Sequence, residues 1–322
     1  MKKPLLKLAA FAVLFSLCFL LIPSALAEEP LRIGVSIPSA THGWTGGVNY
    51  SAREAKKRIE SAYGDKVRIT IITANNAQEQ ANGLEDLMAV NKINALVILP
   101  FESAPLTEPV KRVKEKGIFI TVVDRGLTEP GIEDLYVAGD NPGMGVESAD
   151  YFLSAFKGKT ANIVILRGIP TVIDTERYES FLKKIQSSGI KVLDSKFANW
   201  NRDDGFKVMQ DYLTRFPKID AVWAQDDDIA LGVLDAIKQA KREKEMFVVG
   251  GGGMKEIIKR VMEKDPIIPV DVLYPPYMIG TAIELTALKA VSPVPIRGRY
   301  ILKAPLVTPE NAKEYYFPDS PF

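Results

Sequence analysis

One unit repeats along this chain after Ala27: an apolar run of five to seven residues followed by an amphipathic helix. Short, near-continuously apolar runs are typical of strands that a parallel sheet buries on both faces. Helices that alternate with such strands cover the two faces of the sheet. The repeat therefore predicts an α/β fold with parallel sheets.

The repeat comes in two series of similar size, which predicts two doubly wound lobes. Strands of the first series are predicted over 31–37, 67–73, 95–99, 118–123 and 135–138. Strands of the second series are predicted over 161–166, 190–197, 221–224, 247–250 and 268–273. Helices of the second series are predicted near 175–188, 203–216, 227–240 and 254–264.

Helices of the first series are recognised by apolar residues three and four apart. A polar loop is predicted over Pro38–Gly47, and the apolar face of the helix after it consists of Val48, Ala52, Ala55, Ile59 and Ala62. The next helix has a stripe of Ala81, Leu84 and Met88, and Val110 and Val113 mark another. A last helix, Tyr277–Ala290, and the tail beyond Pro293 follow the second series, and we expect them to return to the first lobe.

The N-terminal segment has the pattern of a secretory signal peptide. Lys2, Lys3 and Lys7 precede an apolar stretch, and Ala25-Leu26-Ala27 has the small-x-small form of a cleavage site. We expect cleavage after Ala27 and export to the periplasm. An uncleaved membrane anchor is the alternative, but the apolar stretch is short for a span of about 20 residues. A lipid anchor on Cys18 is disfavoured by Leu17, which stands where a small residue is usual.

Composition excludes several classes of function. Lys and Arg number 41 against 40 Asp and Glu, so no basic field is present to bind nucleic acid. Cys18 is the single cysteine and leaves with the signal peptide, so disulfide and thiol chemistry are not expected. His42 is the single histidine, which excludes two-histidine metal sites. We expect neither a metal nor a cofactor.

Polar and aromatic residues gather where the apolar runs end: Asn75, Glu102, Asp124, Arg125, Trp200 and Asp226. Ligands of parallel α/β sheets bind outside the carboxyl ends of the strands. The chain shows no nucleophile–base constellation, so a binding protein without catalytic residues is the main interpretation. An exported carbohydrate-active enzyme that uses carboxylates such as Glu102 and Asp226 is the alternative, and it depends on a separation that the sequence does not give.

Two of the three tryptophans stand in polar surroundings. Trp44 lies in the Gly-rich loop, and Trp200 lies between Asn199 and Asn201 after a strand. Sugars and polyols present C–H faces that stack on aromatic rings, with hydroxyls at the periphery for hydrogen bonds. We expect both indoles to stack on a ligand, although each could simply pack under its loop. Trp223 lies inside an apolar run and is expected in the core.

Charged groups at strand ends complete the predicted binding site. Asp124 can accept hydrogen bonds from two vicinal hydroxyls, and the planar guanidinium of Arg125 can donate a fork of them. Asp226 could be only a helix N-cap, but Asp227 or Asp228 could fill that position and leave Asp226 to a ligand. The glycine run Gly250–Gly253 fits neither common nucleotide-binding pattern, so a nucleotide site is not predicted.

Taken together, the chain resembles periplasmic sugar-binding proteins of the ribose-binding type, which serve ABC importers, from about Leu31 to Val307. The segments that carry the resemblance are GVSIP from Gly34, THGWT from Thr41, VDR from Val123, AGDN from Ala138, TERYESF from Thr175, NWNR from Asn199, VMQ from Val208 and AVWAQDDDIALG from Ala221.

The resemblance implies a type I periplasmic binding protein fold, with two Rossmann-like lobes joined by a three-strand hinge. The crossings would fall near Gly139, Tyr274 and Lys303, which assigns 28–138 plus 274–303 to the N-terminal lobe and 139–273 plus 304–322 to the C-terminal lobe. The lobes would close on one sugar or polyol molecule. The implied partner is an ABC permease, or else a chemoreceptor or sensor kinase, and the protein would be a monomer.

Site residues follow from the same resemblance. It places a ligand at Ser36, His42, Trp44, Glu102, Asp124, Arg125, Arg177, Trp200, Asp226 and Tyr274. Arg177 could instead lie on a solvated helix face paired with Glu176 or Glu179, and His42 could be merely exposed. The chain departs from ribose binders at Asp226, at Tyr274 and at Gly251-Gly252, which replaces an aromatic–acid pair. We therefore expect a ligand other than ribose: another pentose, a branched sugar or a linear polyol.

Overall fold

The computed structural model describes residues 29–40, 43–292 and 294–322. The expected signal peptide, Met1–Ala27, and His42 lie outside the described residues. Within the unit Leu31–Phe322, the strands form two larger sheets and one small pair. We call the six-stranded sheet with its helices the first lobe and the four-stranded sheet with its helices the second lobe.

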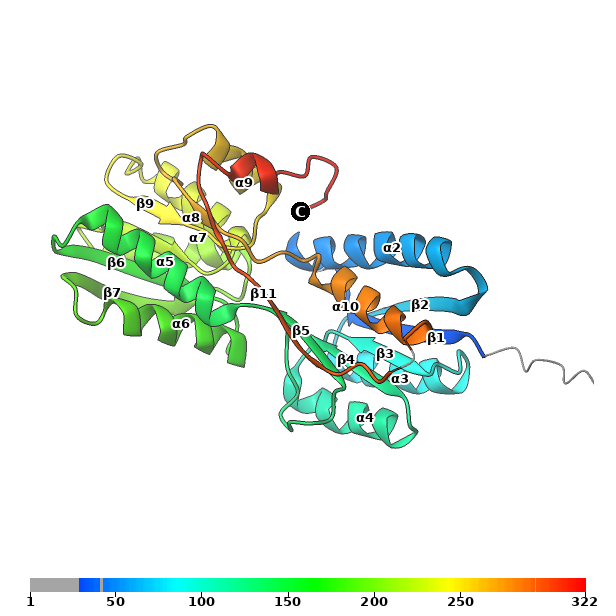
Figure 1. The fold of residues 1–322 in the computed structure, drawn as a ribbon. Helices are drawn as coiled ribbons and strands as arrows, with labels where there is room; N and C mark the ends of the chain where they lie inside the picture. The colour runs from blue at the N-terminus through cyan, green and yellow to red at the C-terminus, as the bar shows by residue number, and fades with distance from the viewer. Residues whose placement is uncertain (1–28, 41–42, 293) are drawn as a thin grey trace, which may run out of the picture. The chain divides into compact units, whose positions relative to one another are not determined.

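The first lobe is built on six parallel strands in the order β11-β5-β4-β3-β1-β2 (Figure 1). Their bounds are β1 Leu31–Pro38, β2 Val67–Ala74, β3 Ala95–Ile98, β4 Phe119–Val123, β5 Leu135–Gly139 and β11 Gly298–Leu302. The central strands β3, β4 and β5 are buried almost throughout, as strands covered on both faces require. The first series of the sequence thus folds into the predicted parallel sheet.

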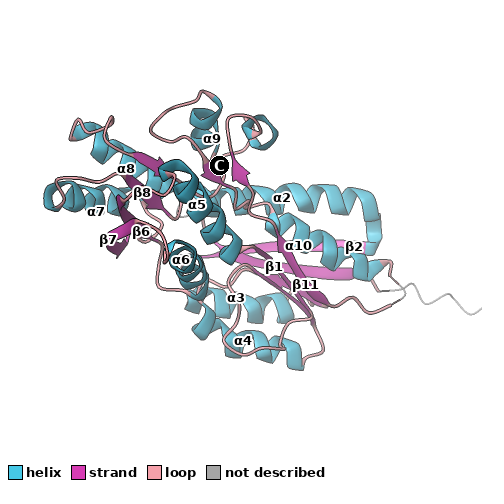
Figure 2. Ribbon diagram, turned by 60° about the vertical axis from the view of Figure 1, so that its left-hand side comes forward, coloured by secondary structure: helices cyan, strands magenta, loops and turns pink. Residues whose placement is uncertain are grey.

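Four helices cover the faces of this sheet. Helix α2 (Gly43–Tyr63) packs with α10 (Met278–Ala287) on one face, and α3 (Ala77–Ala89) packs with α4 (Ser103–Glu115) on the other (Figure 2). Short 3₁₀ turns follow α2 at Gly64–Lys66 and α10 at Leu288–Ala290. Because α10 contacts α2, β1 and β5, the last long helix of the chain packs in the first lobe.

The second lobe is built on four parallel strands in the order β7-β6-β8-β9. These are β6 Ala161–Arg167, β7 Ile190–Phe197, β8 Ala221–Ala224 and β9 Phe247–Val249. Its helices are α5 Asn141–Phe156, α6 Val172–Ile185, α7 Arg202–Arg215, α8 Asp227–Gln239 and α9 Lys255–Met262. Helix α5 packs on α6 and α7 on α8, one pair on each face of the sheet (Figure 2). Trp223 is fully buried and stacks on Phe181 with ring centroids 4.2 Å apart, which confirms its predicted core position.

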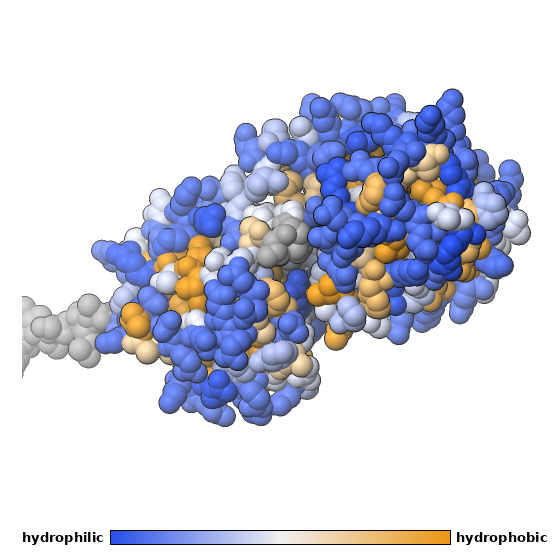
Figure 3. Space-filling view, turned by 180° about the vertical axis from the view of Figure 1, so that it is seen from behind, coloured by the Kyte–Doolittle hydropathy of each residue, from blue (hydrophilic) through white to orange (hydrophobic). Residues whose placement is uncertain are grey.

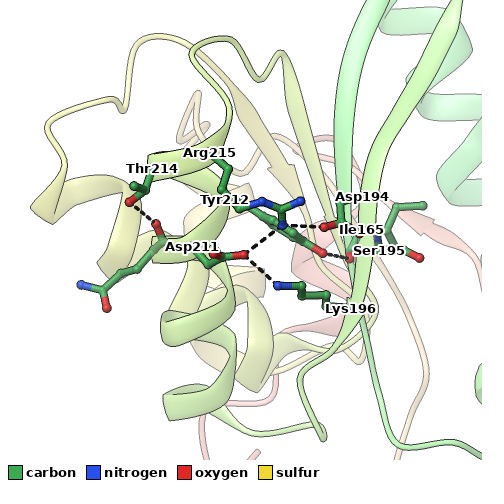
Figure 4. Close-up of polar contacts among 9 residues, drawn as sticks. Ile165, Asp194, Ser195, Lys196, Asp211, Tyr212, Thr214 and Arg215 are labelled. Carbon is green, nitrogen blue, oxygen red and sulfur yellow. Dashed lines mark hydrogen bonds and ion pairs between the residues drawn. The ribbon is translucent and has the colours of Figure 1, made fainter.

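Charged side chains fasten α7 to the edge strand β7 (Figure 4). Asp211 accepts from Lys196 at 2.8 Å and from Arg215 at 3.0 Å, and Arg215 also donates to Asp194 at 2.6 Å. The ring of Tyr212 is buried beside this network. Charged side chains on an edge strand also discourage pairing with another chain.

Three segments of the chain run between the lobes and lie next to one another. Asp140 N donates to Leu302 O at 2.9 Å, so the segment after β5 lies beside the end of β11. Leu273 N donates to Pro305 O at 3.0 Å, next to the antiparallel pair β10 (Asp271–Val272) and β12 (Leu306–Val307). The 3₁₀ turn Ala312–Tyr315 then packs on α9.

Several boundaries differ from the sequence predictions. The loop predicted over Pro38–Gly47 is wrong from Gly43 onward, because α2 begins there. Glycine costs about 1 kcal/mol in a helix interior, but a Cβ on Gly47 would lie 2.7 Å from Pro276 Cγ, so close packing requires glycine at this position. Ala62, expected on the apolar face of α2, is exposed. The strand predicted over 268–273 is reduced to Asp271–Val272.

Helix α5 and strand β11 were not predicted. Helix α5 begins with Asn-Pro-Gly, which suggests a turn, yet Asp140 caps it by accepting from Gly143 N at 2.8 Å, and Pro142 stands in its first turn. Strand β11 is largely exposed and lacks the apolar run by which the other strands were recognised. It forms because β5 offers an unpaired edge, with Leu302 opposite Gly139.

One face of the molecule is mainly polar at its surface. In Figure 3, hydrophilic side chains cover most of the visible face, and apolar residues occur there in separate small groups. None of the helices in the described part of the chain combines the length and the apolar character that a membrane crossing needs.

Candidate ligand-binding site

A cavity with an empty volume of about 340 Å³ is lined by residues of both lobes. Its lining consists of Trp44, Asp124, Arg125, Ile173, Arg177, Trp200, Asp226, Gly251, Gly252 and Tyr274. Seven of the ten residues expected to contact a ligand are therefore brought together.

Trp44 enters the cavity from the first turn of α2. Its Nε1 donates to the carbonyl oxygen of Tyr274 at 2.9 Å, and the two rings lie 6.1 Å apart at 35°. The indole is 7 % exposed. The loop expected around Trp44 is thus a helix start, and the hydrogen bond to Tyr274 fixes the orientation of the ring.

Trp200 lies in a tight turn after β7. Asn199 and Trp200 both have left-handed backbone conformations, with φ of 55° and 51°, an arrangement that non-glycine residues adopt at a cost. The indole lies against Gly168, where a Cβ would be 2.0 Å from Trp200 Nε1. Glycine at position 168 therefore makes room for the ring at the cavity.

Asp124 and Arg125 follow β4 directly, and both side chains are buried. Asp124 has a φ of 58°, and its carbonyl oxygen accepts from the Tyr136 hydroxyl at 2.6 Å. Its carboxylate Oδ1 accepts from the hydroxyl of Tyr274. Burial, followed by the charge of Asp124, raises the pKa of Tyr274, so this phenol keeps its proton and remains a donor. Among the described residues, no group donates to the second carboxylate oxygen, Asp124 Oδ2.

The Arg125 guanidinium is held by backbone on one side only. Its Nη1 donates to Phe101 O at 2.6 Å, and its carbon lies 5.5 Å from the centroid of the Trp200 ring. Nε has no partner among the described residues. Burial lowers the pKa of Arg125, and the nearby charge of Asp124 offsets part of this effect. The guanidinium nevertheless stays protonated, as arginines do in proteins.

Arg177 reaches the cavity from α6. Its Nε donates to Asn141 Oδ1 at 2.8 Å and its Nη1 to Gln225 O at 3.1 Å, and its guanidinium lies 4.3 Å from the Tyr274 ring centroid. The side chain is buried. The alternative of a solvated helix-face arginine paired with Glu176 or Glu179 is therefore wrong, because Asn141 of α5 and Gln225, which follows β8, supply its partners.

Asp226 lines the cavity and also caps α8. Its Oδ1 accepts from Asp228 N at 2.9 Å and from Ile229 N at 3.3 Å. The expectation that Asp227 or Asp228 could be the N-cap residue of α8 is thus wrong. Asp227 instead accepts a hydrogen bond from Gly251 N in the glycine loop, and Asp228 accepts one from Gly43 N at 2.9 Å. Burial, and then the nearby Asp228 and Asp227, raise the pKa of Asp226. Its Oδ2 has no hydrogen-bond donor among the described residues.

Two of the expected residues are not in the cavity lining. Ser36 is buried inside β1, where its hydroxyl pairs with Gln80 Nε2 at 3.2 Å. Glu102 is exposed before α4. Strand direction alone places both residues near the carboxyl edge of the sheet. The side chain of Ser36, however, packs against α3, and that of Glu102 lies in solvent. The third, His42, lies outside the described residues.

Three lining residues were not expected: Ile173, Gly251 and Gly252. Ile173 precedes Arg177 by four positions, so the two share one face of α6, and this spacing could have revealed it. Gly251 and Gly252 offer backbone rather than side chains. A Cβ on Gly251 would lie 1.9 Å from Met144 Cε, so a methionine fills the space that a side chain would take.

A buried carboxylate holds this glycine loop in place. Asp227 accepts from the backbone N–H groups of Gly251 at 2.8 Å, Gly253 at 2.9 Å and Met254 at 2.7 Å. Asp271 lies beside it and accepts from Gly253 N at 3.1 Å. Burial raises the pKa of both carboxyls. The described residues contain no group of histidine, cysteine and acidic side chains suited to a metal ion.

Comparison with known proteins gives a consistent result. The family described as the periplasmic binding protein domain matches residues 33–292. The ribose import binding protein of Bacillus subtilis (strain 168) is 32% identical over 228 residues, which cover 71% of this chain and 70% of that protein. A xylitol-binding protein of Mycolicibacterium smegmatis is 27% identical over 303 residues, 90% of this chain and 80% of that protein. Among solved structures, the fructose binding periplasmic domain of a hybrid two component system superimposes with a TM-score of 0.77 at 29% identity, covering 88% of this chain and 92% of that one.

Proposed function

Since the chain belongs to the periplasmic binding protein domain family, we propose that it binds one monosaccharide or polyol molecule in this cavity, as the substrate-binding component of an ABC importer. The observation that carries the proposal is a set of buried polar side chains that are only half satisfied between two indoles. Asp124 and Asp226 each use one carboxylate oxygen within the protein, and Arg125 and Arg177 each leave guanidinium N–H groups without a protein acceptor.

The chemistry of this set suits a ligand rich in hydroxyls. The set holds two carboxyls and two guanidiniums, so groups of both kinds face the cavity, which favours a neutral ligand. A hydroxyl can donate to a carboxylate and accept from a guanidinium at once, so the free oxygens and N–H groups match alternating hydroxyls. The rings of Trp44 and Trp200 would stack on the C–H faces. Arg125 Nε is a buried polar atom without a partner among the described residues, and leaving it so costs about 1–3 kcal/mol, which an acceptor on a ligand would relieve.

The identity of residue 274 argues against ribose as the main ligand. Its hydroxyl already donates to Asp124, so it has no second proton to donate to a ligand. Gly251 and Gly252 present no side-chain groups to a ligand. A site of this composition would take another pentose, a branched sugar or a linear polyol. We expect ribose to bind at least tenfold more weakly than the true ligand, about 1.4 kcal/mol.

We also propose that the lobes are 28–138 plus 274–303 and 139–273 plus 304–322, and that they close around the ligand. Support comes from the three adjacent crossing segments and from the pairing of β11 with the first sheet and of β12 with β10. A ligand that contacts both lobes would favour the closed arrangement. The N-terminal pattern supports export and cleavage after Ala27, and we propose a periplasmic monomer that delivers ligand to a membrane permease.

One comparison favours a second function, in signalling: a structural relative is the fructose binding periplasmic domain of a hybrid two component system. The same closed form could present a sugar to a sensor kinase or a chemoreceptor. The alternative of an exported carbohydrate-active enzyme loses one of its two proposed carboxylates, because Glu102 is not in the cavity lining.

A thermal-shift screen against pentoses, hexoses, deoxysugars and four- to six-carbon polyols tests the proposal. A ligand at a hundredfold over its Kd adds about 2.7 kcal/mol of stability, which raises the melting temperature. Hits are then incubated with the protein at length and analysed by mass spectrometry. Unchanged recovery agrees with a binding protein, whereas turnover beyond one equivalent would require an enzyme. A screen in which no sugar or polyol shifts the melting curve would refute the proposed ligand class.

A further inference from the structure

The ring of Phe322 lies between the two lobes, outside the ligand cavity. It is 4 % exposed. A Cβ on Gly47 of α2 would be 2.9 Å from Phe322 Cβ, and one on Gly43 would be 3.3 Å from Phe322 Cδ2. On the second-lobe side, a Cβ on Gly252 would be 3.1 Å from Phe322 Cζ. The ring therefore touches the start of α2 and the glycine loop at the same time.

The segment that carries Phe322 is attached to the second lobe. Lys255 of α9 donates to Pro318 O at 3.2 Å and to Ser320 O at 2.6 Å. Tyr315 and Tyr316 pack with Val307 and Ala312 against α9. Because the segment is bound to one lobe and the ring packs on the other, the contact of Phe322 with α2 depends on the arrangement of the lobes.

Glycines on both sides make this approach possible. Gly47 meets Phe322 and also Pro276, which lies just after the crossing segment at Tyr274. Gly252 lines the ligand cavity and, on its other side, a groove of about 1580 Å³ that Phe322 also lines. The ring thus stands directly behind the loop that closes one wall of the cavity.

We propose that Phe322 is a positioning residue that holds the two lobes together around the cavity, as a latch carried by the second lobe. Removal of the ring would leave the cavity residues in place and would favour the open arrangement. The inference rests on the proposed closure of the lobes. Its test needs no ligand, so it can fail while sugar binding is confirmed.

The test measures the distance between the lobes in the ligand-free full chain. Spin labels are attached to cysteines at Glu108 of α4 and Lys207 of α7, whose side chains are 65% and 72% exposed. Cys18 is changed to serine so that only these two positions are labelled. Pulsed electron spin resonance then gives the proportions of short and long distances.

We expect Phe322→Ala to lower the ratio of closed to open molecules about tenfold, which corresponds to about 1.4 kcal/mol, and Phe322→Leu to restore most of it. Phe317→Ala is the matched control, because Phe317 belongs to the same segment and is 63 % exposed. Circular dichroism and melting curves establish that each variant is folded.

A second pair of variants approaches the contact from α2. Gly47→Ala places a methyl group against Phe322 and Pro276, whereas Gly46→Ala places one in open space. Both changes raise helix propensity equally, so only Gly47→Ala should favour the open form. An unchanged distance distribution in Phe322→Ala overturns the proposal, and so does a shift in Gly46→Ala as large as that in Gly47→Ala.

Discussion

Tyr274 shows how a single side chain organises the site. Its hydroxyl donates to Asp124, its carbonyl accepts from Trp44, and the Arg177 guanidinium lies over its ring. It also explains the glycine at position 139, where a Cβ would be 2.2 Å from the Tyr274 ring. One residue at a crossing between the lobes thus orients an acid, an indole and a guanidinium.

We expect Tyr274→Phe to weaken binding of the best ligand by about 0.5–1.5 kcal/mol, because Asp124 loses the donor that orients its carboxylate. Titration calorimetry measures the change. Tyr277→Phe is the control, since that hydroxyl pairs with Glu284 and Arg58 at an exposed position. Equal affinity of Tyr274→Phe and the unmodified protein would mean that the residue contributes shape alone.

Trp44→Ala and Trp200→Ala should each weaken ligand binding by about 1–3 kcal/mol, the scale of a lost stacked and desolvated aromatic contact. Calorimetry with the best ligand of the screen provides the measurement, and melting curves verify folding. Phe197→Ala is a suitable control, because this ring is 41 % exposed on the same strand end as Trp200. Unaltered affinity in both tryptophan variants would remove the stacking role.

At the scale of elements, ion pairs between a strand and the following helix differ sharply in their surroundings. Asp174 of α6 is fully buried, pairs with Arg167 of β6 and accepts from Gly168 N at 2.9 Å. Asp211 of α7 forms an equivalent pair with Lys196 of β7, but both side chains are more than 40% exposed. The first pair positions the helix that carries Ile173 and Arg177.

Asp174→Asn should lower the free energy of unfolding by about 3 kcal/mol or more, because breaking a buried pair leaves an uncompensated charge. Asp211→Asn should lower it far less, since water and salt screen an exposed pair. Urea denaturation of the two variants under one buffer compares them directly. Similar losses in both would show that burial does not control the strength of these pairs.

For the whole molecule, buried carboxyls under the glycine loop make stability depend on pH. Burial raises the pKa of Asp227 and Asp271, and the charge of Asp227 raises that of Asp271 further. In the unfolded chain both would titrate near 3.9. Between that value and the raised native values the folded protein binds more protons than the unfolded one, so stability falls as the pH rises through this window.

Asp271→Asn should remove part of this pH dependence, because an amide donates to Asp227 at every pH. We expect the melting temperature of the variant, relative to that of the unmodified protein, to increase as the pH rises above about 4, the value near which the unfolded carboxyls titrate. Asp235→Asn serves as control, since its pair with Arg202 is exposed. A difference that stays constant across the pH range would contradict the explanation.

The sequence by itself determined the parallel strands other than β11, most helices and the side chains that end those strands. Buried runs such as Ala95–Ile98 and Ala221–Ala224 are legible because both faces of a parallel sheet must be apolar. Asp124 and Arg125 were identifiable because strand direction alone places them at the carboxyl edge. Ser36 and Glu102 show the limit of that argument: a position at the sheet edge does not give the direction or the partners of a side chain.

Tertiary structure alone decided what depends on contacts distant in sequence. Gly47 is tolerated inside helix α2 because Pro276 and Phe322 need the space that a side chain would take. Strand β11 exists because β5 has a free edge. Arg177 is buried because Asn141 and Gln225 receive its hydrogen bonds, and Asp226 is the cap because Asp227 holds a loop more than twenty residues away. Local sequence patterns show periodicity and helix or strand propensity. The outcomes above depend instead on which hydrogen-bond donors, acceptors and packing partners the folded chain brings together.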